Sequence, residues 1–215
     1  MMTNLIGPAG RSESGRLRFG SARILVLIGC VASCAVPYRG GARAVHPVQQ
    51  LGSDWLQAAD TPVVKQRQQT DCGLAALAMV AGAWGRQWTV DDLSQRVPPT
   101  KHGIKLGLLR DLARQRGLDA FAIKASRDDL KNELAKGRPV LLGLMLPHDQ
   151  KRNRSHFEVA IAVNTKDGTL ITIDPATGEW MRRSPQVLDI EWKAAGYAAL
   201  VVTGDKSGNS VGDAR

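Results

Sequence analysis

The segment from Asp71 to Trp84 restricts the fold of this chain more than any other feature. It reads DCGLAALAMVAGAW, and alanine, leucine, methionine and valine leave it without a polar face. A helix that is apolar nearly all round must be covered on all sides by the rest of the protein. We therefore expect a central helix over 71–84, with Asp71 as its N-cap and Gly85 at its end.

Cys72 lies in the first turn of this predicted helix. The unpaired N–H groups and the dipole of a helix N-terminus favour a thiolate over a thiol. Gln66 precedes the cysteine by six positions and is a candidate donor to an oxyanion hole. The alternative is a small, buried core cysteine without chemistry. The position at a helix start favours a nucleophile.

A base and an acid lie on the two arms of a predicted hairpin. His156 begins an apolar stretch, Asp174 ends the next one, and Asp167-Gly168 between them is typical of a tight turn. Antiparallel pairing would bring His156 and Asp174 side by side, which with Cys72 predicts a nucleophile–base–acid triad. Asn164 and Asp167 are alternative third members, but they lie at the wrong end of the hairpin.

Helical patterns come first in the chain and strand patterns follow. Thr89 and Ser126 each begin a capping-box motif, and 105–116 is amphipathic. The expected strands cover 139–145, 157–163, 170–174 and 197–202. This order predicts an α+β fold with helices packed on an antiparallel sheet. A nucleophile on the first long helix, facing a histidine and an acid on the sheet, is similar to the papain-like arrangement.

Residues 1–34 have the pattern of an export signal. Arginines precede an apolar run of 13 residues, 24–36, which is shorter than the roughly 20 residues that span a bilayer. Cys34 follows Val-Ala-Ser and Cys30 follows Leu-Ile-Gly, so both resemble lipidation sites, and Cys34 leaves the longer apolar run before it. The alternative is an ordinary cleaved signal. We expect export to the cell envelope or periplasm, with a lipid anchor in a membrane.

The remaining chain divides into a linker over 35–60, a folded domain over 61–203 and a disordered tail over 204–215. The net charge of +9 includes a run of Lys151, Arg152 and Arg154 before His156, which is either a solvated loop or a surface that attracts acidic substrates. No RNA-binding signature occurs, so nucleic acid is not an expected partner. The histidines lack metal-ligand spacing, and neither a metal nor a cofactor is expected.

Taken together, these motifs resemble the bacteriocin-processing, double-glycine leader peptidase family, a papain-like cysteine peptidase family that supplies the N-terminal domain of many peptide-exporting ABC transporters. The resemblance covers about residues 61–203. It rests on Gln66-x5-Cys72, DCGLAALAM, Ser-His156-Phe-Glu-Val, Asp174-Pro-Ala-Thr-Gly, and the segments 103–109 and 138–143.

The resemblance implies that Cys72 is the nucleophile, His156 the base and then the acid, Asp174 the residue that orients the imidazole, and Gln66 an oxyanion donor. It also implies cleavage of a leader or precursor peptide after Gly-Gly, and a peptide-export system as partner. No Gly-x4-Gly-Lys-Ser/Thr motif occurs, so we expect a standalone domain without an ABC transporter. Two alternatives remain: a cell-wall peptide amidase or acyltransferase with the same triad, and a non-catalytic peptide-binding envelope module.

Overall fold

The computed structural model describes residues 40–47, 51–147 and 153–205. The predicted export signal, including Cys30 and Cys34, lies outside the described residues, as do Lys151, Arg152 and most of the predicted tail. Within the described ranges, no helix combines the length and the apolar character needed to cross a membrane.

The described strands form one eight-stranded sheet in the order β1-β7-β6-β5-β4-β8-β3, and β2 pairs with β5 outside this path. Every strand pair is antiparallel. The strands are β1 (Arg43–Val45), β2 (Trp55–Gln57), β3 (Asp119–Lys124), β4 (Val140–Pro147), β5 (Asn153–Asn164), β6 (Leu170–Asp174), β7 (Glu179–Arg183) and β8 (Ala198–Thr203). The sheet confirms the antiparallel part of the predicted α+β fold.

Five helices accompany the sheet in the described part of the chain: α1 (Cys72–Gly82), α2 (Val90–Arg96), α3 (Leu106–Gln115), α4 (Arg127–Ala135) and α5 (Pro185–Ala194). Every residue of α1 from Cys72 to Ala81 is buried, as its lack of a polar face requires. The capping boxes predicted at Thr89 and Ser126 are both present, at the starts of α2 and α4.

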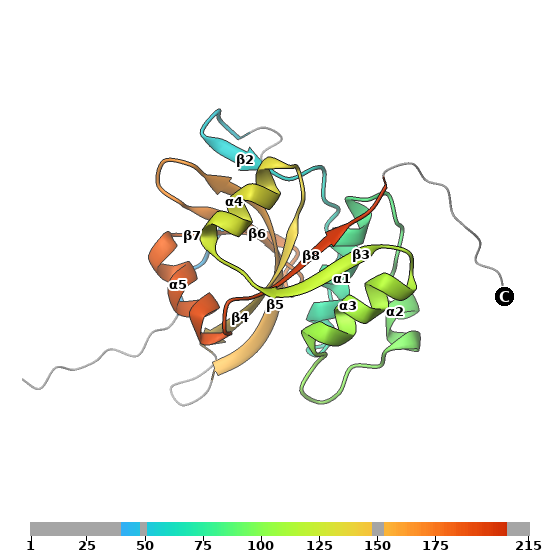
Figure 1. The fold of residues 1–215 in the computed structure, drawn as a ribbon. Helices are drawn as coiled ribbons and strands as arrows, with labels where there is room; N and C mark the ends of the chain where they lie inside the picture. Colours follow the sequence, from blue (N-terminus) through green and yellow to red (C-terminus); the bar gives the residue numbers. More distant parts are fainter. Residues whose placement is uncertain (1–39, 48–50, 148–152, 206–215) are drawn as a thin grey trace, which may run out of the picture. The chain divides into compact units, whose positions relative to one another are not determined.

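Buried apolar side chains form two clusters, because successive residues of a strand point to opposite faces of the sheet. One cluster contains side chains of α1, α2 and α3 with Val159, Ile161 and Ile173. The other contains side chains of α4 and α5 with Leu142 and Leu144. Figure 1 shows α1, α2 and α3 on one side of the sheet and α4 and α5 on the other. The sheet is therefore the shared middle layer of two cores.

Two strands come from the segment predicted as a linker. β1 pairs with β7 and β2 pairs with the far end of β5, so 43–45 and 55–57 are part of the sheet. Each strand has only three residues and is partly exposed, too short for a recognisable alternation of polar and apolar residues. β3, β7 and α5 were not predicted either. For α5, Ser184 as N-cap followed by Pro185 was a usable signal of a helix start.

Candidate active site

The first turn of α1 presents Cys72 at the positive end of a buried helix. Cys72 is a free thiol and only 7% exposed. Asp71 is the N-cap residue, but the prediction that its side chain caps the helix is wrong. Its Oδ2 instead accepts a hydrogen bond from the backbone N–H of Gln68, at 3.1 Å. No side chain therefore caps the N–H groups of this turn, which leaves them available next to Cys72.

Gly73, the next residue, lets the helix start lie close to its neighbours. A Cβ at this position would lie 2.5 Å from Cγ2 of Ile104 and 3.1 Å from Cδ2 of Phe157. Since Phe157 follows His156 on β5, this tight packing sets the position of the helix N-terminus against the histidine strand.

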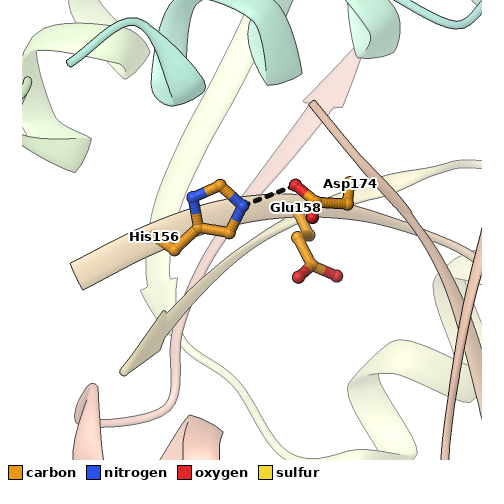
Figure 2. A group of neighbouring side chains, drawn as sticks. All are labelled: His156, Glu158 and Asp174. Carbon is orange, nitrogen blue, oxygen red and sulfur yellow. Dashed lines mark hydrogen bonds and ion pairs between the residues drawn. The ribbon is translucent and has the colours of Figure 1, made fainter. Parts of the chain in front are cut away.

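The predicted neighbours on the hairpin are in contact. His156 Nε2 and Asp174 Oδ1 are 2.7 Å apart, although 18 positions separate the two residues in the chain. The pairing of Val159 with Ile173 places the end of β6 beside this part of β5. Asp174 Oδ1 also accepts the backbone N–H of Ala176 at 2.8 Å, which holds the carboxylate in place. Figure 2 shows the imidazole directed at the carboxylate.

Cys72 lies close enough to His156 for its side chain to raise the pKa of the imidazole. Because Nε2 is used by Asp174, the ring nitrogen that remains for the thiol is Nδ1. The imidazole is 1% exposed. It thus links the cysteine to the aspartate in a site largely closed to water.

This environment changes the proton affinity of both partners. Burial lowers the pKa of His156, but its hydrogen bond with Asp174, the side chain of Cys72 and the negative charge of Glu158 outweigh burial and raise the pKa to about 9. For Asp174, burial raises the pKa, but the hydrogen bond and charge of His156 outweigh it and hold the pKa below its ordinary value. The arrangement therefore favours a protonated imidazole beside the carboxylates of Asp174 and Glu158.

The predicted oxyanion donor Gln66 lies near the loop that follows Asp174. Its backbone N–H donates to the carbonyl of Pro175, next to Asp174, at 2.8 Å. Its side-chain Nε2 donates to the carbonyl of Gln68 at 2.8 Å, and its Oε1 is buried without a hydrogen-bond partner among the described residues. An amide nitrogen carries two hydrogens, so one N–H of Gln66 remains for another acceptor.

The two alternative third members lie at the end of β5 and in the turn that follows it. Asn164 Oδ1 accepts the backbone N–H groups of Lys166 and Asp167, and Asp167 Oδ1 accepts that of Thr169. Their side chains shape the hairpin turn, and Asp174 is the acid that reaches His156.

A buried charged network that was not predicted lies beside the site. Glu158, two residues after His156, accepts two hydrogen bonds from Arg183, at 2.6 and 2.7 Å. Arg183 also donates to Thr172 and to Glu191 of α5, each at 2.7 Å. Burial lowers the pKa of Arg183, but the charge of Glu158 outweighs this and raises it. The glutamate inside the apolar stretch of β5 was the one sequence feature that could have indicated this buried network.

His156, Glu158 and Asp174 resemble a metal-binding group, because one ligand atom from each lies within 4.8 Å of the others. The donor set does not fit a cation, however. Both oxygens of Glu158 are bound by the guanidinium of Arg183, which already supplies the compensating positive charge. The cluster is better described as a hydrogen-bonded ion network.

A cavity of about 340 Å³ opens beside the thiol. Cys72, Ile104 and Phe157 are its buried lining residues, and Lys101 and Arg154 also line it. A peptide that entered this cavity would therefore reach the sulfur of Cys72.

Comparison with known proteins places this geometry in a family. A model of the Peptidase C39 family matches residues 60–206. The probable microcin-H47 secretion/processing ATP-binding protein MchF of Escherichia coli is 28% identical over 131 residues, which are 61% of this chain and 17% of that protein. The chain thus spans about a sixth of the length of this relative.

Two solved structures share the fold, which confirms the predicted papain-like arrangement. One is a putative C39-like peptidase from Bacillus anthracis, with a TM-score of 0.58 and 15% identity, covering 71% of this chain and 98% of that one. The other is a double glycine motif protease from an AMS/PCAT transporter in complex with the leader peptide, with a TM-score of 0.53 and 20% identity, covering 68% and 93%. Because the family model matches more than half of the 215 residues, the chain belongs to the peptidase C39 family and is a cysteine peptidase.

Proposed function

We propose that the peptidase activity of this chain is carried by Cys72, His156 and Asp174. The observation that supports this most directly is the buried imidazole of His156, which hydrogen-bonds with the carboxylate of Asp174 and lies close enough to Cys72 for the thiol to affect its pKa. Because the pKa of His156 is raised to about 9, the imidazole is protonated at neutral pH and places a positive charge beside the sulfur that acts as nucleophile.

In the first half of the reaction, the thiolate of Cys72 attacks the carbonyl carbon of the scissile peptide bond. The negative charge moves to the carbonyl oxygen, where the uncapped N–H groups of the first turn of α1 and the free N–H of Gln66 are the candidate donors. The imidazolium then gives its proton to the leaving nitrogen, the C–N bond breaks, and a thioester with Cys72 remains.

In the second half, neutral His156 removes a proton from water as the water oxygen attacks the thioester carbonyl. The C–S bond breaks, the amino-terminal fragment of the substrate leaves with a new carboxyl terminus, and the thiolate–imidazolium pair is restored. Asp174 keeps the imidazole oriented through both steps and stabilises its positive charge.

For the substrate, we propose a leader or precursor peptide cleaved after Gly-Gly. MchF carries secretion and processing in its name, and the protease from the AMS/PCAT transporter was solved with a leader peptide. A peptide-export system is the corresponding partner. The support for this part comes from those relatives.

For the location, we propose export and lipid anchoring through Cys34, or through Cys30 if processing occurs earlier. The support is the arginine-rich start and apolar run of 1–36, which lie outside the described residues. Labelling with a fatty-acid probe in cells should mark the full chain and be lost in Cys34→Ala. Labelling that persists in Cys34→Ala but is lost in Cys30→Ala would assign the lipid to Cys30. Absence of labelling in the wild-type protein would reject lipid anchoring.

The catalytic proposal is tested with Cys72→Ala, His156→Ala and the wild type on peptides that contain Gly-Gly or Ala-Ala before the scissile bond. Each variant should lose turnover while its far-UV circular dichroism and unfolding midpoint stay close to those of the wild type. Activity that persists in either variant would contradict the assignment. Product masses from cell-wall fragments separate an amidase from a peptidase, and a thiol-reactive probe that fails to label Cys72 at neutral pH would favour a binding module.

A further inference from the structure

The cavity beside Cys72 has a basic rim. Lys101 and His102 are exposed, Arg154 is partly buried, and all three line the same cavity as the thiol. The described residues that line it include no acidic side chain. Arg154 lies two positions before His156 on β5, so this charge belongs to the strand that carries the base.

Within the described part of the chain, the positive charges of this rim have no acidic partner. Across the ranges that the structure describes, neither Lys101 nor Arg154 forms an ion pair. Unpaired like charges around a cavity attract an oppositely charged ligand and raise its local concentration.

A second cavity, which shares Thr70 with the first, has a different charge pattern. It is lined by Arg67, Asp71 and Asp91, and Arg67 forms an ion pair with Asp91. The positive charge on that side is therefore already matched. The two cavities differ in what they would select, and only the one with the basic rim contains Cys72.

We propose that Lys101 and Arg154 select peptide substrates with acidic side chains close to the scissile bond. The inference rests on the proposed peptidase function and names a feature of its substrate. The two cations bind the carboxylates of the substrate and contribute to binding before and during the reaction. Their effect falls mainly on KM, because they contact parts of the peptide that do not react.

The test uses three fluorescence-quenched peptides that contain Gly-Gly before the scissile bond and differ only in carrying glutamate, glutamine or lysine beside this motif. One set varies a position on the amino-terminal side and a second set a position on the carboxyl-terminal side. In at least one set, the wild type should cleave the glutamate peptide roughly two- to fivefold more efficiently than the glutamine peptide, as judged by kcat/KM. This preference should weaken as salt rises from low to about 1 M.

Charge reversal gives the sharper result. In the double variant Lys101→Glu/Arg154→Glu, the preference should invert, so that the lysine peptide is cleaved better than the glutamate peptide. The control variant Lys166→Gln/Lys193→Gln removes two exposed positive charges that do not line the cavity, and it should keep the wild-type preference. A preference that changes equally in both variants would show general charge attraction and would overturn the proposal.

The cleavage rates separate the substrate preference from the peptidase activity itself. If the wild type cleaves all peptides at equal rates in both sets, the peptidase proposal stands and the acidic preference is wrong. If no peptide is cleaved, fluorescence anisotropy with labelled peptides and Cys72→Ala measures binding alone. The glutamate peptide should then bind more tightly than the lysine peptide, and equal affinities would overturn the inference.

Discussion

Replacing Arg183 with methionine should destabilise the fold by several kcal/mol, although Arg183 is remote from the reacting sulfur in the sequence. Its side chain is 1% exposed and donates four hydrogen bonds of 2.6–2.7 Å to Glu158, Thr172 and Glu191. These contacts join β5, β6, β7 and α5. Methionine fills a similar space but provides neither a donor nor a charge.

The size of this destabilisation follows from the negative charge of Glu158, which stays buried after the substitution. Glu158 is also 1% exposed, and it would lose the cation that binds both of its oxygens. Removing one partner of a buried ion pair costs about 3–5 kcal/mol, because the other charge stays buried without compensation. With a urea dependence of about 2 kcal/mol per molar, the unfolding midpoint should fall by roughly 2 M.

Urea unfolding followed by circular dichroism measures this difference, and Arg127→Met is a matched control. Arg127 pairs with Asp189 on α5, and both side chains are nearly half exposed. An exposed pair of this kind contributes about 0–1 kcal/mol, so the control should shift the midpoint little.

The double variant Glu158→Gln/Arg183→Met removes the charges of this pair and leaves Glu191 as it is in Arg183→Met, so the double variant should be more stable than Arg183→Met alone. A loss below about 1 kcal/mol in Arg183→Met, or a double variant no more stable than the single one, would refute the view that Arg183 compensates the buried charge of Glu158.

Three further outcomes follow from the site. First, kcat/KM should fall as pH rises through about 9, because His156 then loses the proton that it gives to the leaving nitrogen. The folded pKa exceeds the unfolded value of 6.5, so the stability linked to this proton is complete below pH 6.5 and is lost as pH rises through 9; a pH series of activity and urea midpoints checks both. Second, Asp174→Asn should lower kcat roughly 10²- to 10⁴-fold and move the alkaline limb to lower pH, whereas an unmoved limb would contradict the role of this charge. Third, Gly73→Ala should cost about 1–3 kcal/mol and reduce activity, because the new Cβ would lie 2.5 Å from Ile104. Gly107→Ala in α3, where nothing lies within 4 Å, should instead be neutral or stabilising, and equal losses in both variants would reject the packing argument.

The hairpin shows how far local sequence signals reach. Asp167-Gly168 marks the turn, and Gly168 adopts the positive φ of 71° that such a turn requires. The turn brings β5 and β6 together and pairs Val163 with Leu170. A bulge between Ala160 and Ala162 then shifts the register by one residue before the strands reach His156 and Asp174, and the turn does not indicate this shift. This part of the candidate site could be predicted because only a short segment separates the two arms.

Other parts depend on segments that are distant in the chain. β1 and β2 are three-residue strands whose only distinguishing property is their pairing with β7 and β5. The side chain of Asp71 has the chemistry of a helix cap, yet it binds the backbone of Gln68 because the preceding loop turns back onto it. Composition and residue spacing indicate neither the strand pairing of β1 and β2 nor the hydrogen-bond partner of Asp71.

The sequence by itself determined the buried helix, the position of Cys72 at its start and the hairpin that carries the base and its acid, because these depend on periodicity and short-range turns. Only the tertiary structure decided how the charges around them are compensated. Glu158 and Arg183 are 25 positions apart, and their contact exists because β6 lies between β5 and β7. The position of Cys72 beside His156 also depends on tertiary structure. The packing of α1 against β5 places the start of the helix next to a strand more than 80 residues away in the chain.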